Sequence, residues 1–203
     1  AAAVALVALG NAAINETVLL NPSFSLKRVN VESEGMLTPQ QLIRATELPD
    51  GVNLVTVDLA NVRTRLLALP AVEAAEVERD FDGTLTLKVR QRKPVAWVHC
   101  EHMRYLPKTS GRGLLVDAFG YAIPAEVVLN EYASLPIISD EAIDQAPPGA
   151  VIKEPNFKSA LQLLNLLKES EAETGVALQS IAMPNTFALE AHFADGATVT
   201  FGY

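Results

Sequence analysis

The chain has 203 residues, which is enough for one large domain or two small ones. Hydrophobic residues make up 49% of it and charged residues 20%, so the chain can bury a proper core and does not have the composition of a disordered protein. Its net charge of −8 is unevenly distributed: residues 1–112 contain 13 Lys and Arg against 12 Asp and Glu, whereas residues 113–203 contain 3 against 12. Such an acidic half repels phosphate backbones, so we expect no nucleic acid partner, and a basic peptide or protein fits better. The alternative is that the charge serves only solubility.

The N-terminal residues 1–22 are expected to form a helix or the end of a membrane span. Residues 1–9 are continuously apolar, but Gly10 and Asn11 interrupt the run well before the roughly 20 residues that a span requires. The remnant of a signal peptide, or a helix packed on the body of the protein, also fits this pattern. The single cysteine, Cys100, excludes an intramolecular disulfide and does not identify the compartment.

Two short helices are predicted in the first module, residues 23–93. Thr38 followed by Pro39 is typical of a helix N-terminus, and this helix should run through Thr46. Asp58 begins a second helix, whose leucines recur at helical spacing until Pro70 ends it. An Asp in this position is expected to cap the helix and not to act as a catalytic acid.

Three strands complete this module. Residues 25–32 alternate between polar and apolar and predict a strand, and residues 72–79 and 84–92 predict a hairpin over the turn Asp82-Gly83. The order is therefore strand, helix, helix, strand, strand, with both helices expected on one face of a three-stranded sheet. Arg79 and Arg92 are expected to pair with acidic residues of the hairpin, with contact to a partner or to lipid headgroups as the alternative.

The second module, residues 94–203, is predicted to be mostly antiparallel β structure with one long helix, which makes the whole chain α+β. Residues 156–173 form an amphipathic pattern that predicts the helix, and a Pro-rich irregular connection precedes it. The predicted strands are residues 95–100, 104–106, 113–117, 121–123, 176–182, 187–193 and 198–201.

An ordered series of motifs resembles the FtsQ/DivIB family of cell-division proteins, whose first domain is a POTRA (polypeptide-transport-associated) domain. The series begins at Val57-Asp58-Leu59, continues through Leu69-Pro70-Ala71-Val72 and Arg92-Lys93-Pro94-Val95-Ala96-Trp97, and reaches Leu114-Leu115-Val116-Asp117 and Leu135-Pro136-Ile137-Ile138. It covers residues 24–203, with a POTRA-like domain over residues 23–93 and an FtsQ-type β domain over residues 94–203.

This resemblance implies a non-enzymatic scaffold of the bacterial cell-division complex. Such a protein crosses the cytoplasmic (inner) membrane once and has its periplasmic or extracytoplasmic bulk at the division septum. It binds small coiled-coil division proteins of the FtsB and FtsL type. No cofactor, catalytic residue or small-molecule substrate is expected. A POTRA-bearing accessory protein of polypeptide transport or outer-membrane assembly is the alternative.

Two parts of the family pattern have no counterpart here. A complete membrane span is absent at the N-terminus, and the family usually continues past the strand at residues 197–201 with a helix and two more strands. The principal partner-binding strand of the family lies in that continuation, so its residues have no matching positions. Either the β domain continues beyond residue 203, or it is short at its C-terminal end and binds its partners differently.

The predicted partner-binding site is the final strand. A strand at a sheet edge has unpaired N–H and C=O groups to which an extended peptide can add as a further strand. We expect Thr198, Val199, Thr200, Phe201 and Tyr203 to form this site. The strand at residues 25–32 is a second candidate edge.

One cluster of potential metal ligands occurs in the chain, His99-Cys100-Glu101-His102. Zinc requires three or four converging ligands. On a strand, however, His99 and Glu101 point away from the side that Cys100 and His102 share. We therefore predict no metal site, and a metal-dependent enzyme built on these residues is the least favoured alternative.

Overall fold

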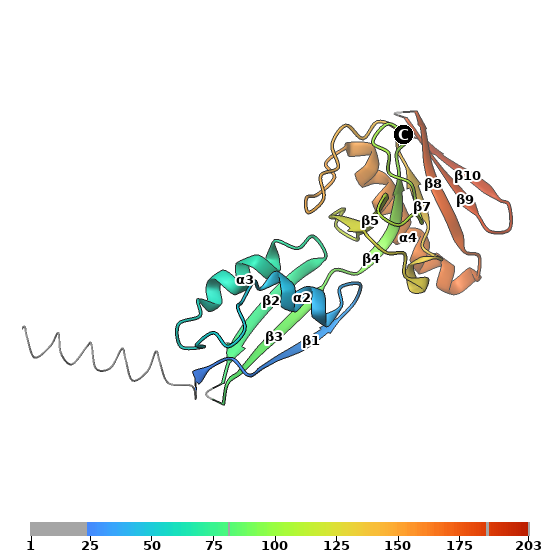
Figure 1. Cartoon of the computed structure of the whole chain (residues 1–203). Coiled ribbons are helices and arrows are strands. Elements are labelled where there is room, and N and C mark those ends of the chain that lie inside the picture. The colour runs from blue at the N-terminus through green and yellow to red at the C-terminus, as the bar shows by residue number, and fades with distance from the viewer. Residues whose placement is uncertain (1–23, 81, 186, 203) are drawn as a thin grey trace, which may run out of the picture. The chain divides into compact units, whose positions relative to one another are not determined.

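The computed structural model describes residues 24–80, 82–185 and 187–202, with the side chains of 169–174 left out (Figure 1). The helix or membrane span expected in residues 1–22 lies outside the described residues. The contacts within the chain divide it into two compact units, the first ending at Gln91 and the second beginning at Arg92. The described residues contain no helix that is both long and apolar enough to cross a membrane.

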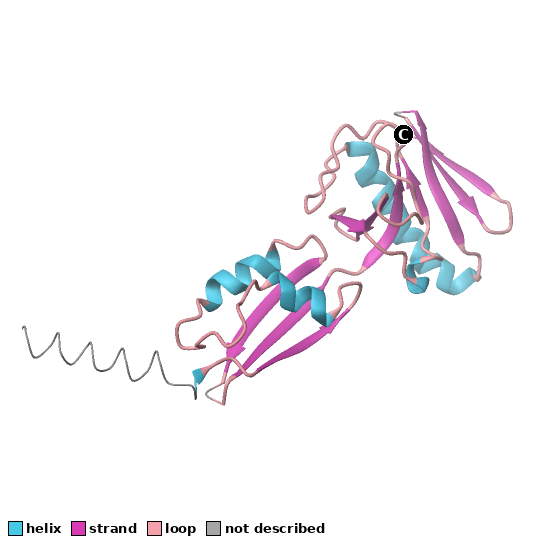
Figure 2. Cartoon of the chain, in the orientation of Figure 1, coloured by secondary structure: helices cyan, strands magenta, loops and turns pink. Residues whose placement is uncertain are grey.

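The first unit has the predicted order of elements around a three-stranded sheet. The elements are β1 (Arg28–Glu34), α2 (Pro39–Ala45), α3 (Leu59–Leu67), β2 (Val72–Arg79) and β3 (Thr84–Gln91). β3 is the central strand, parallel to β1 and antiparallel to β2. Both helices lie on one face of this sheet (Figure 2).

Local capping explains where the two helices begin. The Thr38 side chain accepts the N–H of Gln41, and the Gln41 side chain accepts the N–H of Thr38, so that two free backbone donors are satisfied at once. One carboxylate oxygen of Asp58 accepts the N–H groups of Ala60 and Asn61 at 3.0 and 3.1 Å. Asp58 is therefore a helix cap, as predicted.

The core of this unit lies between β3 and the helices. Leu85 and Leu87 of β3 are fully buried, and they pack in one cluster with the fully buried Leu42 of α2 and Leu66 of α3. Alternate residues of a strand point to the same face, so the leucines of β3 line the side that the helices cover. The alternating apolar residues from which this strand was predicted are thus the ones that pack against the helices.

The second unit contains a seven-stranded sheet and the long helix α4 (Pro155–Thr174). Its strands are β4 (Pro94–His99), β5 (Gly113–Asp117), β6 (Ala122–Ala125), β7 (Ile137–Ser139), β8 (Leu178–Asn185), β9 (Ala188–Phe193) and β10 (Thr198–Gly202). Their order across the sheet is β10-β9-β8-β7-β4-β5-β6. All neighbouring pairs are antiparallel except β4 with β7 and β7 with β8. The α+β fold class is confirmed.

Two details of the second unit differ from the prediction. The strand predicted at residues 104–106 does not form, because residues 101–104 make a turn that leaves Tyr105 in a single bridge to Cys100. β7 is the second difference, because it forms in a segment for which the sequence predicts an irregular connection. It has only three residues, which is too short for an alternating pattern to be recognised.

Helix α4 covers the middle of one face of the large sheet. Its buried Phe157, Ala160 and Leu164 belong to one apolar cluster with Val98 of β4 and Ile181 of β8. This cluster is the core of the second unit.

Trp97 is fully buried in the same unit. Its indole N–H donates to the carbonyl oxygen of Tyr132 at 2.8 Å, within the short 3₁₀ helix η2 (Asn130–Tyr132). A β-carbon added to Gly113 would lie 2.7 Å from the Trp97 ring, so glycine makes this close packing possible. The only tryptophan of the chain is thus a core residue.

Candidate functional site

Strand β10 forms one edge of the seven-stranded sheet. It is joined to β9 by a turn in which the side chain of Asp195 accepts the N–H of Ala197 at 2.9 Å. On the side away from β9, no strand of the described part of the chain pairs with it. Its outer backbone groups are therefore the only ones of this hairpin that a further strand can reach.

The hydrogen-bond register shows which residues of β10 face outward. Phe193 donates its N–H to the carbonyl oxygen of Ala197 at 2.9 Å, so these two residues form a hydrogen-bonded pair. Such pairs alternate along an antiparallel ladder. Val199 therefore points its N–H and C=O toward β9, and Phe201 does the same. The backbone groups of Thr198, Thr200 and Gly202 point to the open edge.

The two faces of β10 differ in polarity. Val199 lies opposite Ala191 and Phe201 lies opposite Leu189, and both of these β9 residues are buried. Phe201 packs against the apolar core, but Val199 remains 42% exposed. Phe187, which is 71% exposed, precedes the residue that pairs with Gly202 at the end of the strand. Val199 on β10 and Phe187 just before β9 are thus exposed apolar side chains of this hairpin region.

The other face of the hairpin is polar. Thr198 lies opposite His192, and its hydroxyl group is 3.1 Å from Nδ1 of that histidine. Thr200 lies opposite Glu190. Four of the five residues predicted to bind a partner therefore lie together on one edge strand, and the fifth, Tyr203, is outside the described residues. Partner binding by these residues stays a prediction.

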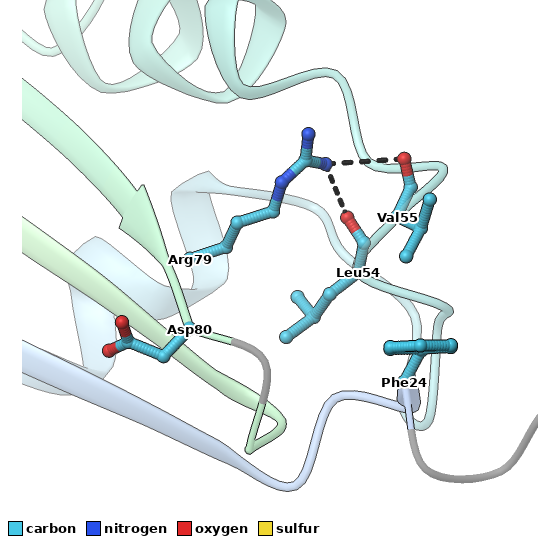
Figure 3. Close-up of a pocket in the computed structure, with 5 residues that line it drawn as sticks. All are labelled: Phe24, Leu54, Val55, Arg79 and Asp80. Carbon is cyan, nitrogen blue, oxygen red and sulfur yellow. Dashed lines mark hydrogen bonds between the residues drawn. The ribbon is translucent and has the colours of Figure 1, made fainter.

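A small pocket lies at one end of the first unit (Figure 3). It is lined by Phe24, Leu54, Val55, Arg79 and Asp80. Nη1 of Arg79 donates to the carbonyl oxygens of Leu54 at 2.6 Å and Val55 at 3.2 Å. These bonds tie the end of β2 to the loop before α3.

The hydrogen bonds of Arg79 correct the prediction for this residue. Nη1 also reaches the carbonyl oxygen of Val57 at 3.3 Å, and among the described residues the guanidinium group makes no ion pair with Glu76, Glu78 or Asp80. An arginine that already satisfies several backbone carbonyls stabilises the fold. It is poorly placed to recognise an anion.

Three potential metal ligands meet in the second unit: Cys100, His102 and Glu141. Cys100 is fully buried, and its burial raises the pKa of the thiol. The backbone N–H of Glu101 donates to both carboxylate oxygens of Glu141 at 2.9 and 3.1 Å, and this bond is the main cause that lowers the pKa of the Glu141 carboxyl.

The sequence placed Cys100 and His102 on one side of the chain but missed Glu141. The reason is that Glu141 lies 41 residues from Cys100, after β7. The parallel pairing of β4 with β7, in which His99 lies beside Ser139, brings the two segments together. No local pattern of the sequence contains this register.

Comparison with known proteins identifies the first unit. Residues 24–92 match the model of the POTRA domain, FtsQ-type. The chain is also similar to the cell division protein FtsQ of Mycobacteroides abscessus, with 24% identity over 199 residues that cover 98% of this chain and 56% of the relative.

Two further relatives carry the same name. FtsQ of Streptomyces coelicolor is 41% identical over 71 residues, which are 34% of this chain and 27% of the relative. FtsQ of Corynebacterium glutamicum is 20% identical over 87% of this chain and 72% of the relative. The chain spans about half or less of the length of the first relatives that it matches. Residues 24–92 are therefore an FtsQ-type POTRA domain, and nearly the whole chain is similar to proteins named cell division protein FtsQ.

Proposed function

We propose that this chain is the extracytoplasmic part of a non-enzymatic scaffold in the bacterial cell-division complex. In this proposal residues 1–22 are the end of a membrane span, residues 23–93 are the POTRA domain next to the membrane, and residues 94–203 recruit partners at the septum. The partners are small coiled-coil division proteins of the FtsB and FtsL type. The FtsQ-type POTRA domain and the similarity of nearly the whole chain to a cell division protein FtsQ support the division role.

The observation that carries the recruitment mechanism is the open edge of β10. Thr198, Thr200 and Gly202 direct backbone donors and acceptors to this edge, and an extended segment of a partner can satisfy them as an added strand. The exposed Val199 and Phe187 supply apolar contacts for the side chains of such a segment.

Charge favours a basic segment as the added strand. Residues 113–203 carry 3 Lys and Arg against 12 Asp and Glu, and Glu190 lies on the polar face of the hairpin. Complementary charge of this kind raises the association rate and helps to exclude wrong partners. Binding is therefore expected to weaken as salt is added.

The sharpest test uses proline at the outward-facing Thr200. A Thr200→Pro change removes an N–H that points to the partner, whereas the inward bonds of Val199 to β9 remain. We expect the full-length protein with this change to bind the extracytoplasmic segments of its host's FtsB-type and FtsL-type proteins at least about tenfold more weakly, in line with about 1.4 kcal/mol for a hydrogen bond and its lost register. Thr200→Ala, which keeps the N–H, is the matched control.

The outcome of this titration is unambiguous when both variants are folded. Equal affinity of Thr200→Pro and Thr200→Ala would contradict β10 as the binding edge. If a later part of the full-length chain covers this edge, both variants should bind with full affinity, and that result would contradict the proposal too. The division role is tested separately by localising the fluorescent full-length protein in its host. A midcell band before constriction supports it, whereas a uniform peripheral signal with normal division after depletion favours polypeptide transport or outer-membrane assembly.

A further inference from the structure

We propose that Cys100, His102 and Glu141 form a divalent-metal site that takes zinc. The ligands are the Cys100 sulfur, one imidazole nitrogen of His102 and one carboxylate oxygen of Glu141. Thiolate, imidazole and carboxylate are the three ligand types that zinc uses in proteins. Neither the division role nor the open edge of β10 depends on this site.

The distances between the three donor atoms fit one zinc ion. Sγ of Cys100 lies 3.3 Å from Nδ1 of His102 and 4.0 Å from Oε2 of Glu141, and these last two atoms are 3.4 Å apart. Zinc bonds of about 2.3 Å to sulfur and about 2.0–2.2 Å to nitrogen or oxygen, set at tetrahedral angles, place their ligands roughly 3.3–3.6 Å apart. The separations of 3.3 and 3.4 Å already lie in this range, and the third, 4.0 Å, closes with a small movement of the Glu141 carboxylate.

The backbone holds the ligand-bearing segments together without the metal. Cys100 and Tyr105 exchange two backbone hydrogen bonds of 3.2 and 3.0 Å, which close the turn that carries His102. The N–H of Asp140 donates to the carbonyl oxygen of His99 at 3.1 Å, which fixes the start of the Glu141 loop beside the end of β4. The site is therefore preorganised, so that little ordering entropy opposes metal binding.

The Glu141 carboxylate is also oriented by a neighbour that is not itself a ligand. The N–H of Glu101 donates to both of its oxygens. Partners of this kind hold metal ligands in position, and their loss commonly weakens binding 10- to 100-fold. Glu101 thus acts through its backbone, whereas its side chain lies outside the group of three.

Burial and charge give the site one closed side and one open side. Cys100 is fully buried, while the side chains of His102 and Glu141 are 47% and 55% exposed. A zinc ion on these ligands has its remaining position toward solvent, where water can complete a tetrahedron. The two negative charges of a thiolate and a carboxylate match the charge of the ion. Bound zinc would fasten the turn after β4 to the loop after β7.

The test is a titration of the purified, chelator-treated chain with Co²⁺ and then Zn²⁺. Cobalt bound to a thiolate gives a sulfur-to-metal charge-transfer absorption, and its affinity order allows zinc to displace it. We expect one equivalent of metal, the charge-transfer band, and loss of the band on addition of zinc. Cys100→Ser should abolish the band, while His102→Asn and Glu141→Gln should each weaken zinc binding at least about tenfold.

Controls separate this site from adventitious binding. His192→Asn removes another partly exposed histidine of the same unit, 90 residues further along the chain, and should leave zinc affinity unchanged. Cys100→Ser changes a buried residue, whereas His102→Asn and Glu141→Gln alter exposed side chains and keep the test valid if Cys100→Ser does not fold. No thiolate band in the wild-type chain, or zinc affinity unchanged in these two variants, would overturn the proposal.

Discussion

Nη1 of Arg92 donates to Oδ2 of Asp117 at 2.9 Å, and the two side chains are only 15% and 7% exposed. The other oxygen of Asp117 accepts the N–H groups of Phe119 and Tyr121, both at 2.9 Å. The guanidinium group also stacks 3.5 Å from the centre of the Tyr121 ring. The expectation that Arg92 pairs within the hairpin of the first module is therefore wrong, because its partner lies 25 residues further along the chain.

This buried pair should be costly to break. Asp117→Ala leaves a buried guanidinium and two backbone N–H groups without their acceptor, and we expect it to lower the free energy of unfolding by about 3–5 kcal/mol. Urea unfolding followed by the fluorescence of Trp97, the only tryptophan, reports on this unit. Glu126→Ala at an exposed position is the control and should stay within about 0.5 kcal/mol of the unaltered chain. A loss for Asp117→Ala as small as that of the control would contradict this assignment.

The cap at Asp58 should stabilise the first unit by a smaller amount. Asp58→Ala removes the acceptor of two N–H groups at the start of α3, and we expect a loss of about 1 kcal/mol. Asp58→Asn keeps a side-chain oxygen and should retain most of the stability. Trp97 lies in the second unit, so its fluorescence does not report on α3. The effect is therefore measured as hydrogen exchange of α3 peptides by mass spectrometry. Equal exchange in both variants would show that the cap contributes nothing.

Local signals explain what the sequence predicted well. The caps at Thr38 and Asp58 and the turn at Asp82-Gly83 act over a few residues, so the elements beside them are found within about two residues of their predicted ends. The apolar stripe of α4 likewise fixed that helix. These signals need no knowledge of the rest of the chain.

Contacts between segments that lie far apart in the sequence could not be predicted from it. β7 has three residues and is a strand only because β4 and β8 pair with it on either side. That same pairing places Glu141 beside Cys100, and the return of β5 along β4 places Asp117 beside Arg92. The position of β10 at a sheet edge could be predicted, because this prediction required only that a strand form near the end of the described residues.

Tyr132 provides a prediction about pH. Its burial, with the neighbouring Glu131 carboxylate as a further cause, raises the pKa of the phenol to about 12 from an ordinary value of 10.0. The folded chain therefore keeps this proton at pH values where the unfolded chain has lost it. Its contribution to stability is fully present below pH 10 and is lost as the pH rises toward 12.

Tyr132→Phe separates this contribution from general alkaline unfolding. The carbonyl group that accepts the Trp97 indole N–H is kept, and only the ionisable hydroxyl is removed. We expect the stability of the unaltered chain to fall more steeply than that of the variant between pH 10 and 12, as measured by urea unfolding at fixed pH steps. Parallel curves over this interval would mean that the phenol titrates normally.

The contact between Gly113 and Trp97 yields the last prediction. A β-carbon at position 113 would lie 2.7 Å from the indole ring and 2.9 Å from the carbonyl oxygen of Thr109, and neither group is the free end of a flexible side chain. Since Trp97 is fully buried and its ring is held by the bond to Tyr132, the ring has little room to move. Gly113→Ala should therefore lower the free energy of unfolding by about 1–3 kcal/mol, the usual cost of overpacking.

Gly202→Ala is the matched control for this change. The nearest atom to a β-carbon at position 202 is 3.9 Å away, which is ordinary van der Waals contact, and the residue lies on the exposed edge strand β10. Its effect on stability should be within about 0.5 kcal/mol. Both variants are measured by urea unfolding with Trp97 fluorescence, whose emission should also shift if Gly113→Ala displaces the ring. If Gly113→Ala unfolds at the same urea concentration as Gly202→Ala, the packing of Trp97 against β5 is looser than the structure has it.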